Sequence, residues 1–205
     1  AAGADRVLAV DLHAAQIQGF FDIPVDHLNA SPVLLKYFQG IRDELGPICL
    51  VSPDIGNVKM ASQYANWLNG DFAIIDKRRK SGTVVESSNI IGDVKDKTVL
   101  MFDDMISTAG TVCEAAKLVK KHGALDVYAA CTHPVLVGLA MERMAEAPIK
   151  RIVCTNTIPC GSRCRPIQDK LVELSVAELI GEAIHRIHHN LSVSILFRMD
   201  TGSKR

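Results

Sequence analysis

The sequence predicts an α/β fold in which helices flank a parallel sheet. Short apolar segments rich in β-branched residues alternate with longer amphipathic segments, a pattern typical of parallel sheets covered by helices. The 205 residues suffice for one large domain or for a domain and a half. Hydrophobic residues make up 48% of the chain and charged residues 22%, and this balance argues against a disordered or collagen-like protein.

Six segments have the composition of buried strands. They lie at residues 6–10, 48–52, 72–76, 98–102, 127–131 and 151–154. Residues 89–91 predict a further strand, and the turn residues that follow favour antiparallel pairing with the strand at 98–102. In open α/β sheets, ligands bind at the carboxyl ends of the strands, so the residues just after each strand are the candidates for function.

Five amphipathic segments predict helices. They lie at residues 31–45, 57–69, 110–122, 136–145 and 175–189. Pro32 suits the first turn of a helix, and Gly46 and Gly123 stand where a helix would end in the left-handed conformation. Ser175 precedes Glu178 with the spacing of a capping box, which predicts a helix start there.

The charge balance gives the chain no overall attraction for nucleic acid or for a membrane surface. The 23 basic and 23 acidic residues cancel to a net charge of +0, so local groups must hold any anionic ligand. We expect no nucleic-acid partner and no membrane partner, because no apolar run approaches the ~18–20 residues of a membrane span.

The six cysteines indicate a reducing compartment. Most of them lie inside apolar runs, which is typical of buried thiols in a cytoplasmic protein. Cys160 and Cys164 are four residues apart in a polar segment, but no second pair of ligands stands nearby to complete a metal site. We therefore expect a cytoplasmic protein with reduced cysteines.

Two acids and a turn of small residues follow the strand at 98–102. Asp103 and Asp104 come first, and the turn then comprises Ser107, Thr108, Ala109, Gly110 and Thr111. The backbone N–H groups of such a turn, at a helix N-terminus, suit a phosphate monoester, and the carboxylates suit the vicinal hydroxyls of a sugar. A plain capped turn with solvated acids is the alternative, but acids placed directly after four apolar residues favour a sugar-phosphate site.

The segment from Asp103 to Thr111 resembles the ribose-5-phosphate loop shared by phosphoribosyltransferases and ribose-phosphate pyrophosphokinases. Other segments resemble the pyrophosphokinases alone, in the order of that family: residues 11–26, 51–54, 75–79, 89–94, 155–159 and 192–197. The resemblance covers almost the whole chain. It implies a phosphoribosyltransferase-like parallel sheet flanked by helices, with a partial second domain of the same type.

The resemblance also implies an activity. Pyrophosphokinases of this family transfer the diphosphoryl group of ATP to the C1 hydroxyl of ribose 5-phosphate, making phosphoribosyl pyrophosphate and AMP for nucleotide biosynthesis. It further implies Mg²⁺ as cofactor, phosphate and ADP as effectors, and a homo-oligomer built from dimers into a hexamer. One alternative is a phosphoribosyltransferase, which leaves the motifs around His13 and Lys77 unexplained. The other is a catalytically silent, synthetase-like regulatory subunit.

By resemblance, four residues carry the chemistry of transfer. Lys77 would stabilise charge on the transferring group, and Arg79 would bind the sugar phosphate. His13 would contact Mg²⁺ or the nucleotide, and Asp54 would be a metal ligand. Taken alone, a basic cluster is usually a solvated surface and a single histidine is usually structural, so these roles depend on the resemblance.

The resemblance assigns the other motif positions to metal binding, to loop orientation or to regulation. Asp11, Asp22 and Asp26 lie in the motif of His13 and would either bind the metal or orient the loop. Ser192 and Ser194 fall in the regulatory phosphate and ADP region. Ser107 departs from the family, which carries a third acid at this position, and the departure permits the silent subunit.

The resemblance predicts three parts of the chain. Residues 1–29 would be a remnant of the N-terminal synthetase domain, residues 30–190 the C-terminal phosphoribosyltransferase-like domain, and residues 191–205 a C-terminal tail. The family's N-terminal ATP-binding part would be absent, so we expect the chain alone to be inactive.

Overall fold

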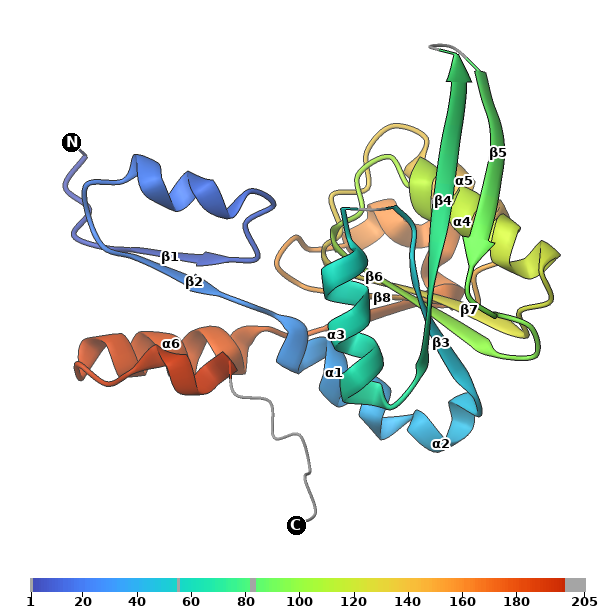
Figure 1. Cartoon of the computed structure of the whole chain (residues 1–205). Coiled ribbons are helices and arrows are strands. Elements are labelled where there is room, and N and C mark those ends of the chain that lie inside the picture. Colours follow the sequence, from blue (N-terminus) through green and yellow to red (C-terminus); the bar gives the residue numbers. More distant parts are fainter. Residues whose placement is uncertain (1, 55, 82–83, 198–205) are drawn as a thin grey trace.

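The computed structural model describes residues 2–54, 56–81 and 84–197, with all side chains in these ranges except those of residues 77–88 and 197. The described strands form a seven-stranded sheet in the order β5-β4-β3-β6-β7-β8-β9 and a two-stranded sheet of β1 and β2 (Figure 1). The strands are β1 Val7–Val10, β2 Val25–Leu28, β3 Ile48–Ser52, β4 Asp71–Ser81, β5 Val84–Ile91, β6 Thr98–Met105, β7 Asp126–His133, β8 Arg151–Thr155 and β9 Leu171–Leu174.

The predicted α/β class is confirmed, and every neighbouring pair in the large sheet is parallel except β4 with β5. The predicted pairing of residues 89–91 with 98–102 is wrong. Residues 89–91 end β5, which pairs with β4 in the register Ile75↔Ile90. Strand β6 is buried along Thr98–Phe102 and therefore needs neighbours on both sides, which β3 and β7 provide. The turn at residues 92–97 thus carries the chain from the sheet edge to its centre.

The described helices are α1 Ser31–Gly40, α2 Arg42–Leu45, α3 Val58–Leu68, α4 Gly110–Lys121, α5 Ala140–Glu146 and α6 Ala177–His188, with 3-10 turns η1 Ala15–Phe20, η2 Gly161–Lys170 and η3 Val193–Phe197. The helix predicted at 31–45 divides at Ile41. The one predicted at 136–145 begins only at Ala140, because Leu136 and Gly138 adopt left-handed backbone angles. Ser175 accepts a hydrogen bond from the N–H of Ala177 at 3.2 Å, in place of a capping box.

Two hydrophobic cores hold the large sheet, one on each face. Helices α1 and α3 cover one face, where Tyr64 stacks on Phe102 with ring centroids 3.7 Å apart. Helices α4 and α5 and turn η2 cover the other face, where Met101 and Met144 belong to one buried cluster. Since β6 contributes buried side chains to both cores, its carboxyl end is held firmly in place.

The small sheet packs against the other end of the chain. Helix α6 runs alongside β1 and β2, away from the large sheet (Figure 1). Leu28, Leu179 and Ala183 form the buried centre of this contact, and Leu196 of η3 packs against them. Segments separated by about 150 residues in the chain therefore build one small layered unit around the parallel pair β1–β2.

All six cysteines are buried and none forms a disulfide. Burial raises the pKa of Cys49 to about 11 and that of Cys154 to about 12, so both remain protonated thiols at neutral pH. The predicted burial of the cysteines is confirmed. In the described part of the chain, no helix combines the length and the apolar character that crossing a membrane requires.

Candidate sugar-phosphate site

Strands β3 and β6 end at a common hollow of about 190 Å³. It is lined by Asp54 after β3, by Asp103 in β6 and by residues 105–112. The parallel pairing of β3 and β6 brings the two carboxylates to the same edge of the sheet, as the sequence predicts. The hollow therefore joins a pair of acids to the turn that begins α4.

Asp103 is the first of the two adjacent acids in β6, and it is partly buried. Its Oδ1 accepts hydrogen bonds from Asn57 Nδ2 at 3.1 Å and from the backbone N–H of Asp104 at 2.9 Å. Burial in the first place, and the neighbouring Asp104 carboxyl in the second, raise the pKa of Asp103 to about 7. The site thus holds a carboxyl group that changes protonation near neutral pH.

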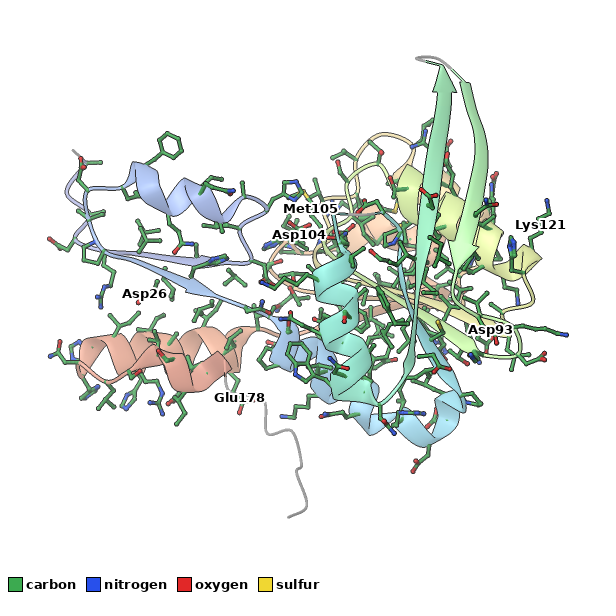
Figure 2. All side chains as sticks on the ribbon, in the orientation of Figure 1. Asp26, Asp93, Asp104, Met105, Lys121 and Glu178 are labelled. Carbon is green, nitrogen blue, oxygen red and sulfur yellow. The ribbon has the colours of Figure 1, made fainter. Side chains whose placement is uncertain are left out.

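His13 reaches this edge from the small sheet. Its Nδ1 donates to Asp104 Oδ2 at 2.6 Å, and Asp104 lies on the side of the large sheet that faces the small one (Figure 2). This hydrogen bond and the negative charge of Asp104 raise the pKa of His13. Since 70% of its side chain is exposed, His13 keeps its other ring nitrogen available to a ligand.

The turn before α4 has the properties of an anion cradle. Ala109 precedes the helix with a left-handed φ of 59°, and the first turn of α4 contains no acidic residue. The turn is fixed from outside, because Val137 donates its N–H to Ser107 O at 3.0 Å and Arg143 Nη1 donates to Thr108 O at 2.8 Å. Fixed backbone N–H groups at a helix N-terminus favour the binding of a phosphate group.

Asp54 is anchored through its own turn. Its backbone oxygen accepts from Ser52 Oγ at 2.6 Å, and its Oδ1 accepts from the N–H of Asn57 at 3.0 Å. Among the described side chains, no three His, Cys, Asp or Glu gather to hold a metal ion. Mg²⁺ is commonly held by one or two carboxylates together with water and substrate phosphates, so the Asp54 and Asp103 pair fits this ion.

The structure separates three acids of the His13 motif from that hollow. The Asp11 carboxylate accepts from Thr132 Oγ1 at 2.6 Å and from the N–H of Ala30 at 3.0 Å. Asp26 forms an ion pair with Arg6 at 3.2 Å, and Asp22 is exposed between η1 and β2. The contacts of Asp11 are those of a residue that orients a loop.

Lys77 and Arg79 are residues of β4. In the pairing with β5, Lys77 stands opposite Ser88 and Arg79 opposite Val85. Their side chains are outside the described residues, so their predicted roles stay predictions. The polar residues Lys80 and Ser81 continue β4 to its end. The β4–β5 pair projects beyond the neighbouring strands (Figure 1).

Ser192 and Ser194 lie exposed beside the end of α6. Ser192 Oγ accepts from the N–H of Ser194 at 3.2 Å, and its backbone oxygen accepts from Arg186 Nη1 at the same distance. These contacts order the segment locally, and its regulatory role stays a prediction.

Sequence reasoning missed three residues that shape the site. Asn57 bonds Asp103, while Thr132 and His133 bond the segment that leads to His13. A usable signal was present, since Thr132 and His133 directly follow the apolar run at 127–131, where functional residues are expected.

The sequence of the chain is similar to those of known proteins. A family model described as "Phosphoribosyl synthetase-associated domain" matches residues 83–198. Ribose-phosphate pyrophosphokinases of Rhodopirellula baltica and Clostridium tetani are 54% and 52% identical to the chain over 199 and 198 residues. Each match covers 96% of the chain, and 62% and 61% of those relatives.

A solved structure is also similar. The crystal structure of phosphoribosylpyrophosphate synthetase from Mycobacterium smegmatis matches 92% of the chain with 40% identity and a TM-score of 0.82. The match covers 60% of that structure, so the chain spans about three fifths of the length of its relatives. The chain belongs to the family of ribose-phosphate pyrophosphokinases, also called phosphoribosyl pyrophosphate synthetases.

Proposed function

We propose that the protein transfers the diphosphoryl group of ATP to the C1 hydroxyl of ribose 5-phosphate, giving phosphoribosyl pyrophosphate and AMP. The supporting observation is the hollow at the end of β6, where paired acids face an anion-binding turn. In the reaction, the C1 oxygen bonds to the β-phosphorus of ATP, the bond from that phosphorus to the α-phosphate oxygen breaks, and the C1 hydroxyl loses its proton.

Different residues at the hollow would bind the phosphate and the ribose. The turn formed by Ser107, Thr108, Ala109, Gly110 and Thr111 would hold the 5-phosphate through backbone N–H groups and hydroxyls. Asp103, which lines the hollow, and its neighbour Asp104, which does not, would accept hydrogen bonds from the ribose hydroxyls. Ser107 offers a hydroxyl where the family carries an acid, so it can donate to the phosphate without repelling it.

Charge neutralisation would drive the transfer itself. Mg²⁺ bound at Asp54 would neutralise phosphate oxygens, with His13 directed to the metal or the nucleotide from the other side. Lys77 and Arg79 would contribute positive charge, Lys77 toward the diphosphoryl group and Arg79 toward the sugar phosphate. Their position on the projecting β4–β5 pair is compatible with an approach to a bound substrate.

Calorimetry with ribose 5-phosphate tests the binding half of the proposal. The chain should bind ribose 5-phosphate but bind ribose only weakly, because the turn recognises the phosphate. Thr108→Val and Gly110→Ala at the turn should each weaken binding, while the matched variant Gly181→Ala, in α6, should leave it unchanged. No heat of binding at millimolar ribose 5-phosphate would refute the sugar-phosphate site.

A coupled assay for AMP separates catalysis from binding. We expect the 205 residues alone to bind ribose 5-phosphate without turnover, and a longer protein with this sequence to turn over. In that protein, Lys77→Ala should abolish AMP formation and the matched variant Lys121→Ala should retain it; Lys121 lies at the far end of α4 (Figure 2). Binding without AMP formation in the longer protein would favour the silent regulatory subunit, which Ser107 permits.

The remaining predictions concern location, assembly and regulation. By resemblance to the family, the protein would form a homo-oligomer built from dimers into a hexamer. A cytoplasmic location and a role for Ser192 and Ser194 in binding phosphate or ADP complete the proposal.

A further inference from the structure

His13 and Asp104 come from different sheets, so something must hold one sheet against the other. His13 follows β1 of the small sheet, and Asp104 lies near the end of β6 in the large one. Their hydrogen bond of 2.6 Å joins a mostly exposed side chain to a partly buried one. An exposed ion pair contributes too little to stability to define this geometry alone.

The end of β7 supplies a second and less exposed connection. In the pairing of β6 with β7, Asp103 stands opposite Cys131 and Met105 opposite His133, so His133 ends the strand beside the acids. His133 Nε2 lies 3.0 Å from Val10 O and 3.2 Å from Asp11 O. Because both partners are acceptors, Nε2 must carry the proton that bridges to the small sheet.

The other ring nitrogen fixes the orientation of His133. Its Nδ1 shares a hydrogen bond of 2.9 Å with Thr157 Oγ1, from the segment after β8. Thr157 Oγ1 is itself 2.9 Å from Thr132 O, and Thr155 Oγ1 donates to the same oxygen at 2.7 Å. The ring is therefore held by the ends of two strands of the large sheet.

Hydrogen bonds from His133 and Thr132 hold Asp11. Its φ of 41° places it in the left-handed region, which residues other than glycine adopt uncommonly. Its N–H donates to Leu28 O at 3.0 Å, and its carboxylate accepts from Thr132 Oγ1 at 2.6 Å. Bonds to both sheets thus hold Asp11 in the conformation that reverses the chain two residues before His13.

We infer that His133 is a positioning residue: it locks the turn at Val10 and Asp11 and thereby directs His13 toward Asp104. Thr132 assists by bonding the Asp11 carboxylate. The importance of this position for catalysis rests on the proposed function, whereas the geometry can be tested without any activity.

Cross-linking measures the position directly. With His13→Cys and Asp104→Cys in the same chain, a short bifunctional alkylating reagent that fluoresces once both of its arms have reacted with thiols reports how often the two positions meet. The native cysteines are all buried, and burial raises the pKa of the Cys131 and Cys154 thiols, so the introduced pair should react first.

Two substitutions of His133 separate position from mere packing. His133→Gln keeps an N–H donor near the site of Nε2, while the shorter His133→Asn loses it. We expect the bridging rate to fall about tenfold in His133→Asn, as for loss of one hydrogen bond to partly buried carbonyls, and to change less than about twofold in His133→Gln. The control His122→Asn, at the exposed end of α4, should behave like the unaltered pair.

The outcomes decide the inference. Equal bridging rates for His133→Asn and His122→Asn, with both proteins folded, overturn it. If His133→Asn does not fold, Thr132→Val serves instead, since it deletes only the hydroxyl that bonds Asp11, and an unchanged bridging rate there also overturns it. Slower bridging together with no ribose 5-phosphate binding would refute the proposed function and leave the positioning role standing.

Discussion

The two sheets of this protein achieve order in different ways. The central strand β6 of the large sheet buries Val99, Met101, Leu100 and Phe102 between two cores, each covered by helices. Strand β1 of the small sheet is only partly buried along its length, and one helix, α6, supplies the core beneath it. Packing therefore holds Asp103 and Asp104 in place, whereas hydrogen bonds between the sheets hold His13.

The largest effect should come from the core of the large sheet. Phe102→Ala removes a ring that is 1% exposed and stacked on Tyr64, so we expect a loss of about 4 kcal/mol in the free energy of unfolding. Denaturation in urea measures it. Phe20→Ala, at a ring that is 88% exposed, is the control and should leave the midpoint unchanged. Similar losses for both would contradict the packing argument.

A smaller and local effect is expected in the small unit. Leu179→Ala opens the contact of α6 with Leu28 and should cost about 2–3 kcal/mol. Hydrogen exchange should become faster in α6, β1 and β2, while the amides of β6 and β7 remain protected. Uniformly faster exchange in both sheets would show instead that they unfold as one cooperative unit.

Asp103 should make stability depend on pH. Its folded pKa of about 7 lies above the usual 3.8, so its contribution is fully present below pH 3.8 and is lost as the pH rises through about 7. Asp103→Asn removes the cost of ionising a partly buried acid. We therefore expect the free energy of unfolding of the variant, relative to that of the parent, to be about 2 kcal/mol higher at pH 8 than at pH 4. Thermal unfolding at both values measures the difference.

The matched control for this test is Asp126→Asn. Asp126 begins β7, at the end of the strand away from Asp103, and it forms an ion pair with Lys150. Its effect relative to the parent should lack the rise between pH 4 and pH 8. A pH dependence of equal size in both variants would contradict the burial of Asp103 as its cause.

The smallest effect should come from the surface of the small sheet. Arg6→Ala breaks the ion pair with Asp26, in which the Arg6 side chain is 43% exposed, and should cost about 0.5 kcal/mol. The loss should shrink in high salt, because exposed charges are screened. A loss that salt leaves unchanged would indicate that Arg6 acts by packing.

The sequence predicted the large sheet better than the small one for a physical reason. Buried strands such as β3 and β6 are recognisable from apolar runs, and Asp103 to Thr111 carries a specific motif. Strands β2 and β9 were missed, because Val25–Leu28 and Leu171–Leu174 are short, partly exposed and mixed in composition. Their pairing depends on partners far away in the chain.

The site shows the same division. Acids at strand ends are visible in a sequence, so the pairing of Asp54 with Asp103 could be predicted. The separation of Asp11 and Asp26 from the hollow could not, since it depends on Thr132 and Arg6, which the motif does not contain. Contacts between the two sheets are set by the fold as a whole and leave no local pattern.

The packing of α6 on β1 and β2 also sets an order of events during synthesis. Strands β1 and β2 leave the ribosome about 150 residues before α6, and the strands of the large sheet are made in between. Closing so long a loop carries an entropic cost, and the large sheet repays part of it by bringing the chain ends together first. The small unit is therefore expected to fold after the large sheet, so the position of His13 is fixed only once α6 has been made.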